Sequence, residues 1–254
     1  MMPAPFDRLT DITVETRGAA RLVTLNRPTK ANALTKAMLA DLQAVISATA
    51  EDESIRLFAL TGAGERIFCA GADLSEAGNE TGSAAQARAY DAQWDGLTAS
   101  IARLPCVTLA LLNGGCIGGG MSVALAFDLR YAQAQGYFSY PAARHGFMPS
   151  PMDVERLTKA GGQSTARRIF LACEKLPVPE ALRAGLVDGL MQEAEPWAAM
   201  ADLMARLETA HPISLLAAKR LIDRDAEAAR LEDLCYRAVY DKDPSAAALL
   251  QTGP

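Results

Sequence analysis

The sequence predicts an α/β fold over roughly residues 1–195, followed by a helical region over 196–254. Short apolar runs alternate with amphipathic stretches of helical periodicity along the first part of the chain. One apolar run ends at Asn113 in a glycine-rich turn, and an amphipathic segment from Met121 follows at once. That order is typical of a buried strand, a turn and a helix start. After Pro141 almost every segment has helical periodicity.

The expected strands are short runs of β-branched and aliphatic residues between turn residues. They are residues 12–14, 21–25, 56–61, 106–112, 129–132 and 137–140. Helices are expected at 35–50, where Thr35 is the N-cap, at 84–102, and in a short segment ending at 127. Later helices are expected at 153–160, 164–172, 179–184, 195–210, 214–223 and 230–240. Residues 75–83 are polar and contain glycine, which predicts a mobile loop.

Composition narrows the class of protein. The net charge of -5 gives no reason to expect nucleic acid or an anionic membrane as a partner. The five cysteines form no C-x-x-C pair, so reduced, buried thiols and no metal site are expected. No apolar run approaches the about 20 residues of a membrane span, and the first residues lack a signal-peptide pattern. These features predict a cytoplasmic protein.

The glycines of residues 114–120 do not form a nucleotide-binding motif. Their spacing departs from G-x-G-x-x-G, and Gly120 is followed by Met121 rather than by the Lys-Ser/Thr of a phosphate loop. One interpretation is a tight turn packed in the core. The other is a turn whose free N–H groups, at a helix start, hold negative charge on a ligand oxygen.

Another turn of small residues, Phe68-Cys69-Ala70-Gly71-Ala72-Asp73-Leu74, lies earlier in the chain and strengthens the ligand interpretation. Two separate turns can each supply one backbone N–H to a single oxygen, which is how an oxyanion hole for a thioester carbonyl is built. One such donor contributes about 3–4 kcal/mol when the transition state carries the charge.

Several motifs, taken together, resemble one family. They are Leu-Asn-Arg-Pro at 25–28 with Asn-Ala-Leu at 32–34, Leu-Thr-Gly-Ala-Gly at 60–64, Phe-Cys-Ala-Gly-Ala-Asp-Leu at 68–74, and Asn-Gly…Gly-Gly-Gly…Ala-Leu-Ala-Phe-Asp-Leu-Arg within 113–130. Ala-Gly-Leu-Val-Asp at 184–188 and Ala-Lys at 218–219 follow. This combination resembles the crotonase family, the enoyl-CoA hydratase/isomerase superfamily, over almost the whole chain.

The resemblance implies a crotonase-like spiral of ββα units, with an acyl-CoA-binding core at 1–195 and a helical oligomerisation region at 196–254. It implies a homotrimer or a dimer of trimers, and an acyl-CoA thioester of fatty acid metabolism as the ligand. The thioester oxygen would be held by the N–H groups of Ala72 and Gly119. No cofactor is expected beyond the CoA moiety of the substrate.

The resemblance also implies where CoA would lie. Arg27 and Lys30 would lie near its phosphates, although both fit equally well as solvated surface charges. The remaining expected contacts are Ala31, Ala33, Ala70, Ala72, Asp73 and Leu74.

Two departures from the family pattern bear on the chemistry. Hydratases of the family carry one glutamate where this chain has Ser122, and a second where it has Ala142. Hydration of a conjugated thioester needs one group to activate water and another to handle the α-carbon proton. Alanine can do neither, and a serine hydroxyl is a poor base without an activating neighbour. Ordinary two-glutamate hydration is therefore not expected.

Other side chains are candidates for proton transfer. His145 lies in the motif that usually supplies a base, although strand alternation would point it away. Ser150 stands where some relatives place an aspartate, and Asp153 follows, with helix capping as its alternative role. Asp73 and Glu76 border the turn at 68–74, which is called the first turn below, and the turn at 114–120 is called the second. Cys116 is not expected to be a nucleophile, since nothing nearby would lower its pKa.

The sequence leaves two classes of function open. The first is an acyl-CoA enzyme that stabilises a thioester enolate in a backbone oxyanion hole and performs isomerisation, hydrolysis or decarboxylation rather than standard hydration. The second is a non-catalytic acyl-CoA-binding protein. A nicotinamide-dependent dehydrogenase is disfavoured by the glycine spacing.

Overall fold

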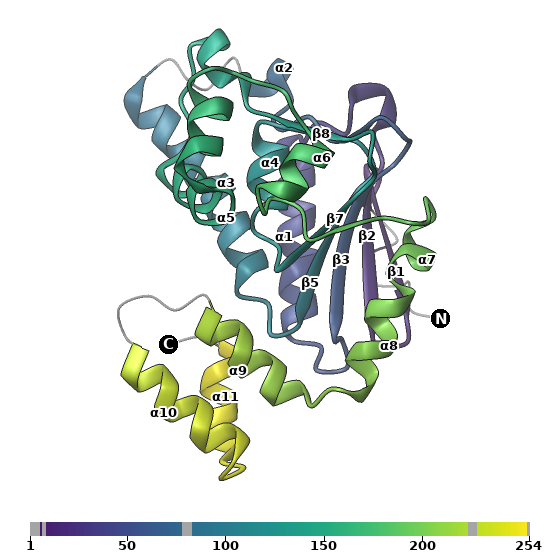
Figure 1. The fold of residues 1–254 in the computed structure, drawn as a ribbon, viewed down its shortest axis with the longest axis vertical. Helices are drawn as coiled ribbons and strands as arrows, with labels where there is room; N and C mark the ends of the chain where they lie inside the picture. The colour runs from purple at the N-terminus through teal and green to yellow at the C-terminus, as the bar shows by residue number, and fades with distance from the viewer. Residues whose placement is uncertain (1–5, 7–8, 78–82, 223–227, 253–254) are drawn as a thin grey trace.

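The computed structural model describes residue 6 and residues 9–77, 83–222 and 228–252. A unit of two strands followed by helix occurs three times within this part of the chain (Figure 1). The first strand of each unit joins a large sheet and the second joins a small one. The units are β3 (Leu57–Gly62) and β4 (Ile67–Cys69) with α2 (Leu74–Ala77) and α3 (Ala84–Ala102), β5 (Val107–Leu112) and β6 (Gly115–Ile117) with α4 (Gly119–Ala124), and β7 (Leu129–Ala132) and β8 (Tyr137–Ser139) with α5 (Pro151–Phe170).

The large sheet has six strands in the order β1-β2-β3-β5-β7-β10. β1 (Ile12–Arg17) and β2 (Ala20–Leu25) form an antiparallel hairpin through Gly18, whose φ is +56°. Every later pairing is parallel, ending with the short β10 (Gly189–Leu190) beside β7. The expected strands at 12–14, 21–25, 56–61, 106–112 and 129–132 are all present, within a few residues at their ends.

The small sheet has four strands in the order β4-β6-β8-β9, where β9 is Leu176–Pro177. The sequence prediction missed β4 and treated β6 as part of a turn. Both have three residues, too few for an alternating pattern to be visible, and glycine at Gly115 is unfavourable in a strand. The small sheet matters because β4 and β6 each lead into one of the two small-residue turns.

Alternation along the central strands divides the core between two faces. Phe58 and Leu60 of β3 belong to the main core with α1, α3 and α5. Their neighbours Leu57 and Ala59 belong to a second cluster on the opposite face. Since both faces are covered, β3 is buried along its whole length, as expected for a strand inside a parallel sheet.

The helices that carry the site agree well with the prediction. Thr35 caps α1 (Lys36–Ala50) by accepting a hydrogen bond from the Met38 N–H. The helices expected at 153–160 and 164–172 are one element, α5, which is interrupted at Gly162 with a φ of +76°. The expected loop at 75–83 begins as helix α2, and residues 78–82 lie outside the described residues. Three short helices complete this region, namely the 3-10 helices Pro28–Lys30 and Pro141–His145, and α6 (Val178–Arg183).

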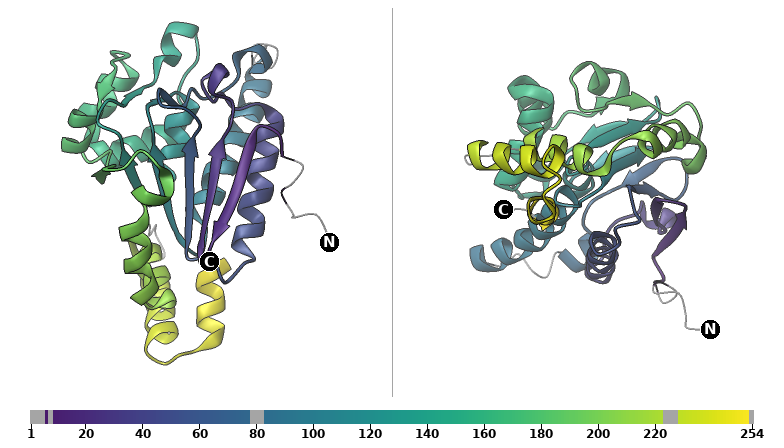
Figure 2. Two further views of the ribbon diagram at one scale, coloured as in Figure 1. Left: turned by 90° about the vertical axis from the view of Figure 1, so that its right-hand side faces the viewer. Right: turned by 90° about the horizontal axis from the view of Figure 1, so that it is seen from below.

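The helical C-terminal part divides between two environments. α7 (Pro196–Ala199) and α8 (Ala201–Thr209) cover the outer face of the large sheet through Trp197, Met200 and Leu203. α9 (Pro212–Ile222), α10 (Ala228–Val239) and α11 (Pro244–Thr252) form a cluster of their own beyond the end of the sheet (Figures 1 and 2). The helix expected at 195–210 is therefore two helices that belong to the core. α11 was not predicted, and residue 223 of the expected helix 214–223 lies outside the described residues.

A buried lysine joins this helical cluster to the core. The Lys219 Nζ donates to the Asp128 carboxylate at 2.8 Å and to the Cys106 carbonyl at 3.0 Å. Asp128 in turn accepts from the Thr108 N–H on β5. A buried charge is tolerated only when it is paired in this way, so the pair fixes where α9 leaves the core.

Two further observations bear on function. Over the described ranges, no helix has the length and apolar character needed to span a bilayer. In the same part of the chain, no cluster of three or more His, Cys, Asp or Glu side chains is arranged to hold a metal ion.

Candidate active site

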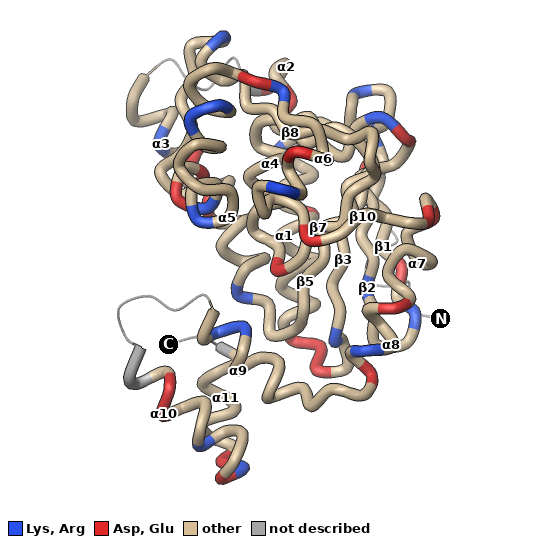
Figure 3. Tube along the Cα trace, in the orientation of Figure 1, with Lys and Arg blue, Asp and Glu red and all other residues tan. Residues whose placement is uncertain are grey.

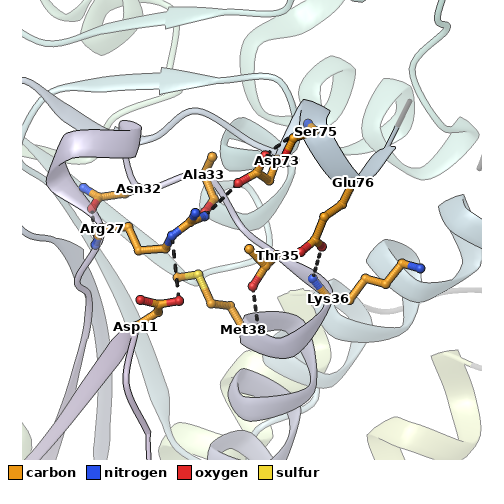
Figure 4. A network of polar contacts seen from close by, with 10 residues as sticks. All are labelled: Asp11, Arg27, Asn32, Ala33, Thr35, Lys36, Met38, Asp73, Ser75 and Glu76. Carbon is orange, nitrogen blue, oxygen red and sulfur yellow. Dashed lines mark hydrogen bonds and ion pairs between the residues drawn. The ribbon is translucent and has the colours of Figure 1, made fainter. Parts of the chain in front are cut away.

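The first wall of the site is the loop after β2, which an arginine ties to the turn after β4. The Arg27 guanidinium donates to the Asp73 carboxylate at 3.0 Å and to the Ala33 carbonyl at 2.7 Å, and it also faces Asp11 (Figure 4). The hydrogen bond from Ser75 has the largest effect in holding the pKa of Asp73 below its usual value, and the hydrogen bond from Arg27 has the next largest. Asp73 is thus a structural carboxylate between two loops.

A buried asparagine holds the same loop from inside. The Asn32 side chain donates to the carbonyls of Ala63 and Ile67 and accepts from the Arg27 N–H. Both Ala31 and Asn32 have left-handed backbone, with φ values of +53° and +52°. Such strain in non-glycine residues persists only where the surroundings impose it. The loop therefore has one fixed shape.

This loop leaves the Ala72 amide free. The Leu34 N–H donates to the Gly71 carbonyl at 2.8 Å, and the Asp73 N–H donates to the Leu34 carbonyl at 3.0 Å. Successive residues of an extended segment point to opposite sides, so the Ala72 N–H faces away from Leu34. Among the described residues it has no hydrogen-bond acceptor.

The Gly119 amide is the second donor for which the described part of the chain offers no acceptor. Gly119 is the first residue of α4, so its N–H has no partner within the helix. Gly118 before it adopts a φ of +53° and provides no side-chain cap. A Cβ placed on Gly71 would lie 2.7 Å from the Gly119 nitrogen. The two turns therefore touch, and Ala72 follows Gly71 directly.

The other glycines of the second turn have packing roles. A Cβ on Gly114 or Gly120 would lie within 2.3 Å of backbone atoms of Arg66 or Cys69, respectively. One on Gly115 would meet the Tyr137 ring at 2.6 Å. The core-turn interpretation is thus correct for these three positions, whereas the contact of Gly119 with the Gly71 turn supports the ligand interpretation.

A buried carboxyl lies beneath the second turn. The Tyr140 hydroxyl donates to the Asp153 carboxylate at 2.9 Å, and both side chains are buried. Ser122 of α4 lies beside them, close enough to lower the pKa of each. Its Oγ is buried and has no hydrogen-bond partner of proper geometry among the described residues.

Burial governs the charge state of this pair. Desolvation raises the pKa of Asp153 above its ordinary value, and nearby Asp95 raises it further, while Ser122, Tyr140 and Arg156 oppose the shift. The pKa of Tyr140 is raised as well, first by burial and then by the Asp153 charge. Asp153 is thus a carboxyl that holds a proton more readily than an ordinary aspartate.

Helix α3 supplies the third side of this cluster. Asp91, Trp94 and Asp95 lie on one face, at the i, i+3, i+4 spacing. Figure 3 shows acidic positions where α3 and α5 run alongside each other. The Trp94 ring covers Gly119, where an added Cβ would meet it at 2.6 Å. Burial and the neighbouring Asp95 and Asp153 raise the pKa of Asp91.

Comparison with known proteins agrees with this architecture. Residues 15–251 match the profile of the enoyl-CoA hydratase/isomerase family. The chain belongs to this family. It is 28% identical over 216 residues to a short-chain-enoyl-CoA hydratase of Clostridium acetobutylicum, covering 85% of this chain and 82% of that protein. It is 31% identical over 221 residues to an (E)-benzylidenesuccinyl-CoA hydratase of Thauera aromatica, covering 82% and 80%.

A solved structure gives the same result for the fold. An enoyl-CoA hydratase from Bacillus anthracis superposes with a TM-score of 0.79 at 26% identity, covering 91% of this chain and 92% of that one. The predicted crotonase-type α/β fold is therefore confirmed.

Within this family fold, the site candidates between residues 142 and 153 lie in different places. Ala142 and His145 lie on the 3-10 helix after β8, not on a strand, and the His145 side chain is exposed. Ala142 packs against the main core. Ser150 is the N-cap of α5, accepts from the Asp153 N–H and donates to Asp95. The capping role considered for Asp153 thus belongs to Ser150.

The candidates near the first turn also differ in exposure and in their hydrogen-bond partners. Lys30 and Leu74 are exposed, whereas Arg27 is largely buried and bound to acidic partners. Ala70 donates its N–H to the Ala31 carbonyl. Glu76 is exposed and accepts from the Lys36 N–H at the start of α1. Asp73 and Glu76 both serve the loop structure rather than the buried cluster.

The thiols near the site are unreactive because they are buried. Cys116 is fully buried, and desolvation raises its pKa well above the ordinary value. Burial raises the pKa of Cys69 to about 12. Because the thiolate is the nucleophilic form, the expectation that Cys116 is not a nucleophile agrees with the structure.

Sequence reasoning missed Tyr140, Trp94, Asp91 and Asp95. The signal for the α3 residues was available, since an aromatic residue and two acids share one helix face. Tyr140 offered only its place directly before Pro141.

The raised pKa of the buried Asp153 carboxyl leads to a prediction about the free energy of unfolding. A carboxyl whose pKa is higher in the folded than in the unfolded protein stabilises the fold at pH values below its unfolded pKa. This stabilisation is lost as the pH rises through its folded pKa. Asp153→Asn keeps the acceptor for Tyr140 but cannot ionise. It should be more stable than the wild type at pH 8, by about 1.4 kcal/mol per unit of pKa shift. The advantage should vanish as pH falls towards 4. Thermal unfolding across that range measures it, and a difference independent of pH would contradict the assignment.

Proposed function

We propose that the protein is an acyl-CoA enzyme that stabilises a thioester enolate with the backbone N–H groups of Ala72 and Gly119. The proposal rests on the contact between Gly71 and the Gly119 nitrogen, which brings the two free amides into adjacent turns. The dipole of α4 adds partial positive charge at Gly119. Fixed donors of this kind stabilise charge that develops on an oxygen during the reaction.

The CoA moiety would follow the loop after β2, past Ala31 and Ala33, and the backbone at Ala70. Lys30 is exposed beside this loop and suits a phosphate. Arg27 would act differently from the sequence expectation, since its guanidinium is bound to Asp73 and Asp11. It would keep the loop in shape for CoA. The chemistry calls for no cofactor beyond the CoA of the substrate.

Standard two-glutamate hydration does not suit these residues. Ser122 and Ala142 occupy the positions at which, by the family resemblance, hydratases carry glutamates. Neither can activate water. Reactions that do not need both glutamates remain, namely double-bond isomerisation and decarboxylation, which pass through an enolate. Thioester hydrolysis remains as well, but it passes through a tetrahedral oxyanion and needs another residue to activate water. A protein named an enoyl-CoA hydratase shares the fold. Because one fold supports several reactions, the polar side chains would set the reaction here.

Purified protein incubated with crotonyl-CoA, a malonyl-type thioester and a β,γ-unsaturated thioester tests this function, with products followed by mass spectrometry. We expect turnover of at least one of the last two, and crotonyl-CoA hydration below the about 1–1000 per second of ordinary enzymes. Gly119→Pro removes the amide donor, whereas Gly119→Ala keeps it and adds the same Cβ against Trp94. The proline variant should be slower than the alanine variant by about 100–1000-fold.

Equal rates in the two variants would mean that the Gly119 amide does not hold the oxyanion. Tight acyl-CoA binding without turnover of any thioester would instead support a non-catalytic acyl-CoA-binding protein. Fast hydration of crotonyl-CoA would show that other groups replace the two glutamates.

We also propose that α9–α11 mediate self-association into a trimer or a dimer of trimers. The cluster projects beyond the end of the large sheet and leaves large apolar side chains exposed, namely Ile222, Tyr236, Tyr240 and Leu249. Tyr236 and Tyr240 lie one helical turn apart, with ring centroids at 5.5 Å. Apolar surface of this kind is typical of an interface between copies.

Tyr236→Glu combined with Tyr240→Glu should therefore lower the assembly mass measured by light scattering, because two charges cannot be buried in an apolar interface. Arg206→Ala, on the exposed surface of α8, is the control. An assembly of unchanged mass in the double variant, or a monomeric wild type, would refute the interface.

A further inference from the structure

We propose that the protein binds a free apolar α-amino acid in a cavity between the large sheet and helix α9, remote from the two small-residue turns. The cavity has a volume of about 210 Å³. Its walls come from the connection between α1 and β3, from the connection between α3 and β5, and from α9. The inference does not depend on the proposed enolate chemistry.

The cavity lies at the opposite end of the central strands from the two turns. Arg56 and Val107, which line it, stand at the amino ends of β3 and β5. The first and second turns lie beyond the carboxyl ends of the same strands, and the six residues of β3 span about 17 Å. Figure 1 shows α9 and α2 at opposite ends of the sheet. A molecule in the cavity therefore does not reach the Gly119 amide.

The size of the cavity limits its ligand. A cavity of about 150 Å³ holds one benzene ring, so this one suits a molecule of about eight to ten heavy atoms. CoA is several times larger, which excludes a second site for the substrate. None of the exposed apolar side chains proposed for self-association lines the cavity, so the two proposals concern different surfaces.

Hydrogen bonds at two places keep the cavity from closing. The Arg56 guanidinium donates to the Ala210 carbonyl just before α9. The buried Lys219 Nζ donates to the Cys106 carbonyl at 3.0 Å. These bonds fix both ends of the segment 210–219 on the core, while apolar residues between them line the cavity. The space is therefore part of the fold, since α9 cannot shift to fill it without breaking one of the bonds.

Part of the lining carries positive charge. Arg56 forms no ion pair within the described residues, and its Nε is buried without a hydrogen-bond partner there. Lys219 is 8% exposed and has three N–H donors, of which the Asp128 carboxylate and the Cys106 carbonyl accept two. The N-terminus of α9 at Pro212 also lines the cavity and adds partial positive charge. A carboxylate is the ligand group that suits these donors.

Another part of the lining carries negative charge. Ala50 is the last residue of α1, and carbonyls at a helix C-terminus carry partial negative charge. Glu51 and Glu53 follow, line the cavity and form no ion pair in the described ranges. Asp52 between them is already bound by Arg21 at 2.8 Å. An ammonium group suits this part of the lining.

The remaining lining is apolar and includes Ile55, Val107, Ile213 and Leu216 from three separate segments. A ligand with a carboxylate, an ammonium and an apolar body therefore matches each kind of surface. L-leucine and amino acids of similar size have this composition. A simple carboxylic acid would leave the glutamates unmatched, and a simple amine would leave Arg56 unmatched, and unmatched polar groups reduce affinity.

Calorimetry on the intact wild-type chain with L-leucine tests the site. We expect a dissociation constant of about 1 mM or lower. The analogue 4-methylpentanoate lacks the ammonium of leucine, and 3-methylbutylamine lacks the carboxylate. Each should bind at least about 10-fold more weakly, since each leaves charged groups of the cavity without a partner. Glycine should also bind at least about 10-fold more weakly, because it lacks the apolar body.

Variants at exposed positions of the lining show whether leucine binds in this cavity. Ala50→Trp places a large ring in the space and should lower the affinity for L-leucine at least about 10-fold. Glu51→Gln combined with Glu53→Gln should lower it about 3–10-fold, because exposed charges contribute little. Glu155→Gln, on the exposed surface of α5, is the control and should match the wild type. Circular dichroism shows that each variant is folded.

Several outcomes would overturn the inference. They are no binding of L-leucine to the wild type up to about 10 mM, or an affinity that Ala50→Trp leaves unchanged. Equal affinities for L-leucine and 4-methylpentanoate would overturn the assignment of an amino acid. None of these measurements uses a thioester, so failure of this inference and failure of the proposed function are seen in separate experiments.

Discussion

The contact between the turn after β4 and the start of α4 is the constraint on which the rest of the site depends. Gly71 lies so close to the Gly119 nitrogen that no side chain fits between them. The contact places two main-chain amides from distant parts of the sequence side by side. It exists because β4 and β6 are neighbours in the small sheet, paired at Cys69 and Cys116.

Much of the surrounding structure serves to hold that contact. The Leu34–Gly71 bridge and the Arg27–Asp73 pair fasten the first turn to the loop after β2. Close packing of Gly120 on Cys69 and of Trp94 on Gly119 fastens the second. Backbone donors held from several sides need no reorganisation when charge develops on a bound oxygen, and such preorganisation is a large term in enzymatic rate enhancement.

In the proposed function the two turns hold the oxyanion, and the polar side chains decide which reaction follows. The helix that presents Gly119 carries Ser122 one turn later, and the adjacent carboxyl arrives from α5 through Asp153. A single buried carboxyl suits a proton shuttle, whereas hydration calls for two groups with separate tasks. The proposed function therefore departs from two-glutamate hydration because Ser122 and Ala142 cannot activate water.

Motifs and periodicity predicted the fold class, most strands and the helices from 35 to 127, because these elements are long or carry clear caps such as Thr35. Strands β4 and β6 were missed, since three residues show no alternation. From the sequence the two turns were recognised only as two segments of small residues. Their contact could not be predicted, because it depends on the pairing of β4 with β6 in the small sheet. Asp153 was proposed with capping as its alternative, because sequence alone does not tell which of Ser150 and Asp153 caps α5. Tyr140 and the acidic face of α3 were missed, since their role depends on tertiary contacts.

A crystal structure with a bound acyl-CoA analogue tests the central claim most directly. The thioester oxygen should lie within about 2.7–3.1 Å of both the Ala72 and the Gly119 nitrogens, the range that oxyanion donors require. An analogue whose carbonyl oxygen contacts neither nitrogen, or binds elsewhere on the molecule, would contradict the account.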